Sequence, residues 1–295
     1  MMIVDLLKVI ILSIVEGVTE FLPVSSTGHL ILVNEFVNLQ PDNFANAFNV
    51  IIQLGAIISV VVLYFNRLNP WDLEKTKNYF PKNYQSLNGQ SRFYYRLTHP
   101  HKETMDLWKR VIVAVIPAGI LGFLFDDIID QYLFNPIVVA LMLLTWGIII
   151  ILIENKNKKD KRQRLDNLSL ISYKTAFLIG CFQVLAMIPG TSRSAATIIG
   201  AMVLGLSRGA SAEFSFFLAI PTMLGATLLK VFKNVSGFTG YQWILILIGM
   251  VLSFIVAYIV IKKFMEYIRK HDFIIFGKYR IILSIIVFLY FLIIK

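Results

Sequence analysis

Two short polar segments interrupt long apolar stretches of this chain, and their residues have the chemistry to handle a phosphorylated substrate. The first runs from Glu16 to His29 and reads EGVTEFLPVSSTGH; the second runs from Pro189 to Ser194 and reads PGTSRS. Together they contribute two carboxylates, a histidine, an arginine and a group of hydroxyls. Ionisable groups inside membrane-type segments are costly and usually line a site or a pathway. The two segments therefore predict a single site that binds a polyanion.

The carboxylates of the first segment are spaced for a cation. Glu16 and Glu20 are four residues apart, so on a helix they share one face. They also lie at the C-terminal end of the helix expected before Pro23, where the helix dipole disfavours negative charge. A divalent metal or an arginine would satisfy the pair; Mg²⁺ suits carboxylates that share it with substrate phosphates, and Ca²⁺ is the second candidate. The alternative is a pair of glutamates in a water-filled vestibule or beside lysines, but no lysine lies near them in the sequence.

Hydroxyl residues follow Pro23 at the expected start of the next helix. Ser25, Ser26 and Thr27 fall in its cap and first turn, and helix N-termini bind phosphate readily. For any one serine, plain N-capping is the commoner role. Ser26, His29 or a metal-bound water could attack phosphorus, with a carboxylate or His29 transferring protons. The residues leave this choice open, and His29 could also be a hydrogen-bonded core histidine.

The second segment supplies complementary groups. Pro189 and Gly190 break the backbone, and Arg193 offers a fork suited to bidentate phosphate binding. Three hydroxyl residues are expected to cap the returning helix: Thr191, Ser192 and Ser194. The alternative is an Arg193–Glu20 pair that only locks the two segments together. Such a pair is compatible with phosphate binding, because a substrate could displace it.

Composition places these segments in a polytopic helical membrane protein. The 295 residues are 57% hydrophobic and 16% charged, with a mean hydropathy of +0.71. The net charge of +10 comes from basic residues in short loops, which argues for membrane topology and against nucleic-acid binding. The single cysteine, Cys181, excludes an internal disulfide. The apolar N-terminal stretch continues into Glu16 without a small-residue cleavage site, so we expect mature protein and not a signal peptide.

Six apolar stretches are long enough to cross a bilayer, which takes about 20 residues per helix. They lie near 45–65, 109–125, 136–153, 212–230, 243–262 and 280–294. Two more, 4–36 and 172–203, are broken by the polar segments and are expected to be re-entrant helical hairpins.

The two halves of the chain have the same order of elements. Residues 1–153 and 170–295 each contain a hairpin followed by three spans, and the LGA sequence at Gly55 is repeated at Gly225. A unit with an odd number of crossings is inverted when it is repeated. We therefore expect an all-α polytopic membrane protein, a single domain over 1–295, with six transmembrane helices and two re-entrant hairpins in an inverted-topology repeat.

Charge predicts the orientation. The segments 66–110, 154–174 and 262–280 are rich in Lys and Arg, Arg280 among them, and are expected to be cytoplasmic loops. The 126–135 loop has no basic residue but contains three acids, Asp126, Asp127 and Asp130. Both termini would then face outward, with the first hairpin entering from outside and the second from the cytoplasm. The long, aromatic-spotted 66–108 loop could be an interfacial element, and Glu213 is expected to be a helix-capping acid.

The two polar segments resemble the signatures of the bacterial undecaprenyl-pyrophosphate phosphatases of the bacitracin-resistance type, and the order of elements is similar over nearly the whole chain. The resemblance implies a plasma-membrane hydrolase that removes the terminal phosphate of a polyprenyl diphosphate lipid, undecaprenyl diphosphate. This would regenerate the carrier for peptidoglycan synthesis, cell-wall biogenesis and cell shape, and would confer bacitracin resistance. It also implies divalent-metal dependence, contact with membrane lipids, a homodimer and a site that opens outward.

By position, the resemblance carries over a role for each motif residue. Glu16 and Glu20 match the metal-associated acids, Ser26 the candidate nucleophile, His29 the motif histidine, and Ser192 with Arg193 the diphosphate-binding pair. The chain departs from the family pattern at Ala195, where glycine is usual. One added methyl group is tolerated if the backbone there is helical. The 66–108 segment is also longer than expected.

Two other functions fit parts of the pattern. An ion- or proton-coupled transporter or flippase of a lipid-linked phosphate would also have an inverted repeat with broken helices. Its acids would be a relay, but hydroxyls and His29 at a helix start exceed what a relay needs. The lipid phosphatases with a histidine nucleophile need a histidine soon after the arginine, and none follows Arg193 within the next turns.

Overall fold

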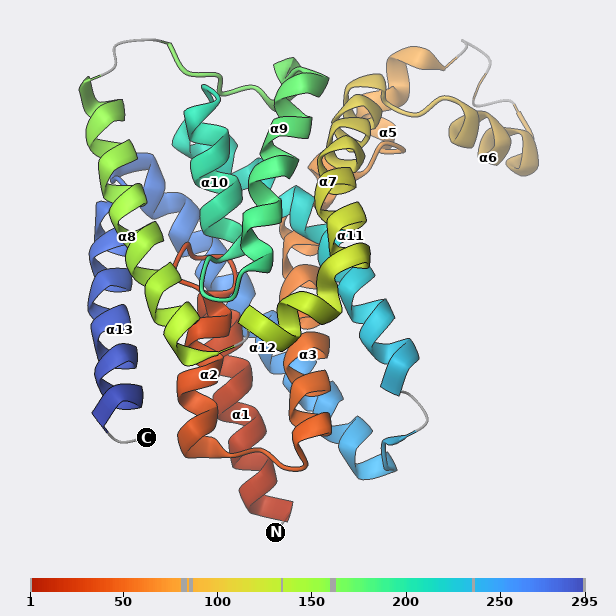
Figure 1. Ribbon diagram of the computed structural model, residues 1–295. Helices are drawn as coiled ribbons and strands as arrows, with labels where there is room; N and C mark the ends of the chain where they lie inside the picture. The colour runs from red at the N-terminus through yellow and green to blue at the C-terminus, as the bar shows by residue number, and fades with distance from the viewer. Residues whose placement is uncertain are drawn as a thin grey trace.

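The computed structural model describes residues 2–80, 84, 87–133, 135–159, 163–234 and 237–293. Every regular element in this part of the chain is a helix, apart from one isolated bridge between Leu165 and Leu206. Six of the helices are long and apolar enough to cross a membrane, as predicted (Figure 1). They are α3 (Asp42–Leu63), α7 (Lys102–Leu133), α8 (Pro136–Lys159), α11 (Arg208–Asn234), α12 (Gly240–Lys270) and α13 (Ile274–Ile293).

Two shorter pairs of helices form hairpins where the polar segments break the chain. The first pair is α1 (Met2–Thr19) with α2 (Ser26–Val37), and the second is α9 (Tyr173–Val184) with α10 (Arg193–Val203). In Figure 1 the α1–α2 pair begins and ends at the end of the molecule that holds the N-terminus, whereas α9–α10 begins and ends at the opposite end. Their turns meet near the middle. This arrangement is compatible with re-entrant hairpins in a bilayer and with an inverted repeat. Both stay predictions.

Close helix contacts hold the spans around the hairpins. The pairs α3–α12, α7–α9 and α8–α13 pack along their lengths. Glycines allow the closest approaches: a Cβ placed on Gly55 would lie 2.1 Å from the carbonyl oxygen of Met250, and one on Gly180 would lie 2.2 Å from that of Ala114. The turn of the first hairpin is packed into the core by Phe21, whose ring meets that of Phe216 edge-on at 5.3 Å.

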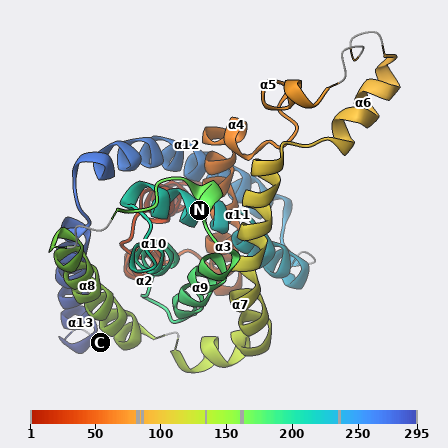
Figure 2. The ribbon, with the colours of Figure 1, turned by 90° about the horizontal axis from the view of Figure 1, so that it is seen from above.

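The segment between the first two spans contains short helices. They are α4 (Phe65–Leu68), α5 (Leu73–Thr76), the 3-10 turn η1 (Lys77–Tyr79) and α6 (Gly89–Thr98). Two further 3-10 turns, η3 (Leu168–Leu170) and η4 (Leu185–Met187), precede and follow α9. Seen from above, α5 and α6 extend sideways beyond the bundle (Figure 2).

Two predictions about loops were wrong. Helix α12 continues to Lys270 and α13 begins at Ile274, so Arg280 is a fully buried helix residue and not part of a cytoplasmic loop. A hydropathy scale favours a loop for any arginine, but the guanidinium of Arg280 donates hydrogen bonds to backbone carbonyl groups inside the protein. Helix α7 extends through most of the predicted 126–135 loop; the side chains of its three acids, Asp126, Asp127 and Asp130, lie outside the described residues.

Glu213 was also assigned wrongly. The Ser207 hydroxyl caps α11 by accepting from the Ala210 N–H at 3.2 Å. Glu213 lies beyond the first turn, and its carboxylate binds the Arg67 guanidinium at 2.6 Å. It therefore links α11 to the segment that follows α3.

Candidate active site

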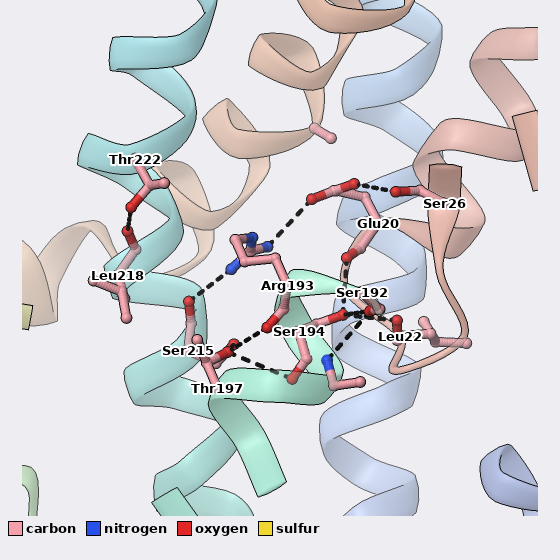
Figure 3. Close-up of polar contacts among 12 residues, drawn as sticks. Glu20, Leu22, Ser26, Ser192, Arg193, Ser194, Thr197, Ser215, Leu218 and Thr222 are labelled. Atoms are coloured by element: carbon pink, nitrogen blue, oxygen red, sulfur yellow. Dashed lines mark hydrogen bonds and ion pairs between the residues drawn. The ribbon is translucent and has the colours of Figure 1, made fainter. Parts of the chain in front are cut away.

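The turns of the two hairpins are bonded directly to each other at the predicted site (Figure 3). The Ser194 hydroxyl, in the first turn of α10, lies 3.2 Å from the Glu20 carbonyl oxygen and 2.8 Å from that of Leu22. Residues separated by more than 170 positions in the sequence therefore form one array. The structure brings both polar segments together, as their chemistry predicts.

Glu20 is the centre of this array. Its carboxylate accepts a hydrogen bond of 2.6 Å from the Ser26 hydroxyl on one oxygen and contacts the Arg193 guanidinium at 3.3 Å on the other. Another nitrogen of Arg193 donates to the Ser215 carbonyl oxygen at 3.0 Å. Both charged side chains are nearly buried, 7% exposed for Glu20 and 11% for Arg193. A hydroxyl whose proton points at a buried carboxylate has the geometry of a nucleophile beside its base.

Glu16 lies one turn before Glu20, at the end of α1. The Glu20 N–H donates to the Glu16 carbonyl oxygen at 3.0 Å, so the helical spacing predicted for the pair is present. Glu16 is completely buried, and neither of its carboxylate oxygens has a hydrogen-bond partner among the described residues. A buried carboxylate without a partner needs a cation or a proton.

These two acids fit a hard divalent cation that is completed by its substrate. The described residues contain no group of three or more His, Cys, Asp or Glu that could hold a metal alone. Mg²⁺ is often held by one or two carboxylates, with substrate phosphates and water supplying its other ligands. Glu16 and Glu20 could provide such a partial ligand set.

The two hairpins begin their second helices in the same way. Ser25 caps α2 by accepting from the Gly28 N–H, and Ser192 caps α10 by accepting from the Ala195 N–H, each at 3.2 Å. Both serines have a positive φ, 75° and 73°. The residue after each cap is the first of its helix, Ser26 in one hairpin and Arg193 in the other. One repeated turn thus presents a hydroxyl and a guanidinium to the same region.

The other predicted residues of the second segment have different roles from those expected. Only Ser192 caps α10, because the Ser194 hydroxyl binds the first hairpin and the Thr191 hydroxyl is buried without a described partner. In the first segment, Thr27 is half-buried in the first turn of α2. Ala195 is helical and buried, so the methyl group that replaces the usual glycine is accommodated.

His29 lies one turn beyond Ser26 but is bonded elsewhere. Its Nδ1 is 2.7 Å from the Ser25 carbonyl oxygen, and its Nε2 is 2.7 Å from the Tyr279 hydroxyl. Because a carbonyl only accepts, Nδ1 carries a proton; when the ring is neutral, Nε2 accepts from the Tyr279 hydroxyl. In the described part of the chain, His29 has no hydrogen bond to Ser26 or Glu20.

Sequence reasoning missed three residues at the site. Tyr279 stacks on His29 with ring centroids 5.6 Å apart, and Ser215 contacts both Arg193 and Thr197, the latter at 2.6 Å between hydroxyls. Arg280 lies behind both hairpin turns and donates to their carbonyls. The sequence signal for Arg280 was an arginine at the edge of a predicted span, and we assigned it to a basic cytoplasmic loop.

Comparisons with known proteins agree with the motifs. The family model described as bacitracin resistance protein BacA matches residues 9–286. Undecaprenyl-diphosphatase 1 of Clostridioides difficile (strain 630) is 51% identical over 288 residues, which cover 97% of this chain and 96% of that protein. The undecaprenyl-diphosphatase of Limosilactobacillus fermentum is 49% identical over 97% of this chain and 98% of its own length. That of Enterococcus faecalis is 48% identical over 97% of each chain.

Proposed function

This chain belongs to the bacitracin resistance protein BacA family, and on that premise we propose that it is an undecaprenyl-diphosphatase. It is a multi-pass membrane hydrolase that removes the terminal phosphate of undecaprenyl diphosphate. The product, undecaprenyl phosphate, returns as the lipid carrier for peptidoglycan and cell-wall synthesis, and the activity accounts for bacitracin resistance. The observation that supports this function best is the Ser26–Glu20–Arg193 array, which joins the two hairpins.

Ser26 is the nucleophile that we propose. Its Oγ attacks the terminal phosphorus while its proton passes to the Glu20 carboxylate 2.6 Å away. The Oγ–P bond forms as the bond from phosphorus to the bridging oxygen breaks, and undecaprenyl phosphate leaves with that electron pair. Water then hydrolyses the phosphoserine, and Glu20 passes the proton back to Ser26. His29 remains the alternative nucleophile or proton carrier, because it lies one turn from Ser26 on α2.

Arg193 and the two helix N-termini bind the diphosphate in this proposal. Phosphoryl transfer depends mostly on positioning and on stabilisation of charge. The Arg193 Nε is buried and donates to no described acceptor, so the guanidinium keeps a free donor for a phosphate oxygen. Its contact with Glu20 is long at 3.3 Å, and a phosphate could replace it. The hydroxyls of Thr27 and Thr191 and the first N–H groups of α2 and α10 are the other candidate contacts.

Glu16 and Glu20 would hold the divalent cation, Mg²⁺ or Ca²⁺. When bound, the ion would neutralise charge on the diphosphate oxygens. The protein's own contribution is the Glu16 carboxyl group, which is completely buried one turn before Glu20 and has no hydrogen-bond partner among the described residues.

We also propose that both termini face outward and that the site opens to the outside. The basic C-terminal ends of α8 and α12 lie at the end of the molecule opposite both termini (Figure 1). The positive-inside rule places that end in the cytoplasm. A homodimer stays a prediction from the family resemblance.

The test is phosphate release from undecaprenyl or farnesyl diphosphate by purified protein, with and without EDTA. Ser26→Ala should lower kcat by at least about 10³-fold, and Glu20→Gln by about 10²–10⁴-fold. Arg193→Ala should lower kcat/KM by about 10³-fold or more. Thr145→Ala is the matched control, because this hydroxyl is exposed on α8 and bonds only within its own helix.

Two outcomes would contradict the proposal. If Ser26→Ala keeps wild-type turnover, Ser26 is not the nucleophile, and His29 or water takes its place. If the folded wild-type protein releases no phosphate with any divalent ion, the hydrolase assignment fails. The array would then be tested as a lipid-phosphate transporter in proteoliposomes.

A further inference from the structure

Arg280 connects the turns of both hairpins from behind. It lies in α13 and is completely buried. One terminal nitrogen donates to the carbonyl oxygens of Gly190 at 2.6 Å and Thr191 at 3.0 Å, both in the second hairpin. The other donates to that of Pro23 in the first hairpin at 3.3 Å. A longer contact of 3.4 Å reaches Met142 in α8. One guanidinium thus holds the two turns and a spanning helix.

The direction of these bonds fixes where the turn N–H groups point. In a trans peptide, the C=O of one residue and the N–H of the next point in opposite directions. The Thr191 carbonyl points at Arg280, so the Ser192 N–H points away from it. Within the described residues this N–H has no acceptor. Arg280 therefore directs an unbonded donor away from itself, next to Arg193.

The charge of Arg280 is also uncompensated within the protein. None of the ion pairs between described residues includes it, and its partners are neutral carbonyl groups. A buried charge without a counter-ion is costly and raises the affinity of the region around it for an anion.

We propose that Arg280 is a positioning residue for diphosphate hydrolysis. It holds the two hairpin turns at the spacing that lets Ser26 and Arg193 act on one substrate, and its charge helps to attract the diphosphate. This inference rests on the proposed phosphatase function.

The test compares Arg280→Lys and Arg280→Met with the control Arg67→Met. Arg67 is half-exposed, and its ion pair is with Glu213 and not with a hairpin turn. A lysine keeps the charge but cannot reach carbonyls of both turns with one planar fork. We expect Arg280→Lys to keep KM within about threefold and to lose about 10²-fold in kcat, the effect of a misplacement of roughly 1 Å. Arg280→Met should lose kcat to a similar degree and also raise KM.

A second measurement does not depend on activity. Spin labels at Phe36→Cys in α2 and Val203→Cys in α10, both exposed positions, report the separation of the hairpins in a Cys181→Ser background. We expect the distance distribution to broaden or shift in Arg280→Lys but not in Arg67→Met. If it is unchanged and kcat stays within twofold of wild type, the proposal is overturned. An inactive wild type with hairpins that separate in Arg280→Lys would refute the phosphatase function and leave the positioning role supported.

A different observation concerns α6, which exposes an apolar face. None of its residues is buried, and Phe93, Tyr94 and Leu97 are 65%, 70% and 48% exposed. At 3.6 residues per turn these three fall within an arc of about 100°. Tyr95, on the opposite side, stacks on His99 with ring centroids 3.9 Å apart. The helix is thus packed on one side and unpartnered on the other.

Helix α6 lies outside the bundle of spans, at its basic end (Figures 1 and 2). Helices α5 and α6 project sideways from the bundle at the end opposite both termini (Figures 1 and 2). The six spans require a bilayer around the bundle. In the orientation proposed above, the basic end faces the anionic leaflet. Arg92 and Arg96 flank the apolar arc on the same helix, and Arg96 is anchored to the Trp71 carbonyl oxygen at 2.8 Å.

We infer that α6 lies on the cytoplasmic membrane surface, with its apolar arc among the acyl chains and Arg92 at anionic headgroups. Amphipathic helices with aromatic residues on one face and basic residues beside it bind interfaces in this way. The occupant of the exposed face is therefore an anionic lipid surface.

The test uses the full chain in nanodiscs of phosphatidylcholine with or without phosphatidylglycerol. A fluorophore at Phe93→Cys, again with Cys181→Ser, should be quenched at least about twofold more by brominated acyl chains than one at Ser91→Cys, which lies off the arc. Arg92→Glu should reduce the quenching that depends on phosphatidylglycerol. Equal, weak quenching at both positions would overturn the inference, as would protection from aqueous iodide without lipid quenching, which indicates a second copy on this face.

Discussion

Replacing Gly55 by alanine is expected to force α3 away from α12. The added Cβ would lie 2.1 Å from the Met250 carbonyl oxygen and 2.8 Å from the Met250 Cα, whereas real Cβ atoms essentially never approach closer than 3.0 Å. The obstacle is backbone, so no side-chain rotation can relieve it. The two helices must separate by roughly 1 Å, and close packing along the interface is lost.

The size of the effect follows from two opposing terms. Overpacking costs about 1–3 kcal/mol, and a clash with backbone belongs at the upper end. Alanine returns about 1 kcal/mol through its higher helix propensity. The net loss in the free energy of unfolding is therefore about 2 kcal/mol. On the scale of soluble domains this lowers the thermal midpoint by about 4–8 °C.

Gly225 is the matched control for this prediction. It occupies the equivalent position in the LGA repeat, but a Cβ there meets no atom within 4 Å. Gly225→Ala should therefore raise the midpoint slightly. The assay is thermal unfolding of both variants in one detergent, with residual phosphatase activity after heating. A midpoint for Gly55→Ala equal to or above that of Gly225→Ala would refute the packing argument.

Three further outcomes are expected. Glu16→Gln should raise the concentration of Mg²⁺ or Ca²⁺ needed for half-maximal turnover by about tenfold or more, because ligand charge sets such affinities; an unchanged titration would contradict the metal assignment. Glu154→Gln should lower the free energy of unfolding by about 1–2 kcal/mol, because Arg208, bound at 2.6 Å, loses its charged partner but is 34% exposed and can be partly solvated; an unchanged midpoint would count against that pair. Partial burial opposes ionisation of Asp272, but hydrogen bonds from Lys158 and the N–H of Ile274 outweigh it and lower the carboxyl pKa. The stabilisation is present above the unfolded pKa and is lost as pH falls through the folded one. Asp272→Asn should therefore destabilise by up to about 1 kcal/mol at pH 7 and by less at pH 3, as unfolding curves at both pH values would show.

The sequence predicted the elements that depend on local composition. Apolar length identified the six spans, because a bilayer sets that length directly. Pro23 and the Pro189–Gly190 pair marked the helix breaks, and hydroxyls after each break marked the caps. The meeting of Glu20 with Arg193 followed from charge, since each needed a partner at membrane depth.

Contacts between distant segments could not be predicted in the same way. Arg280 binds the Pro23 carbonyl, 257 residues away. Every residue has a backbone carbonyl, so the sequence does not show which one accepts this bond. His29 is bonded to Tyr279 across 250 residues, and Arg67 to Glu213 across 146. Each of these pairs depends on how helices pack, and hydropathy contains no information about their relative rotation.

The positive φ angles of Ser25 and Ser192 create a conflict between thermal stability and phosphatase activity. Each φ, 75° and 73°, costs a non-glycine residue about 1–3 kcal/mol. Glycine would relieve most of that strain, while the lost cap costs only roughly 0.3 kcal/mol. A laboratory selection for heat resistance alone would thus be drawn to these two positions. The survivors would gain robustness by loosening the turns that aim Ser26 and Arg193, so only a screen that also scores phosphate release would retain a working enzyme.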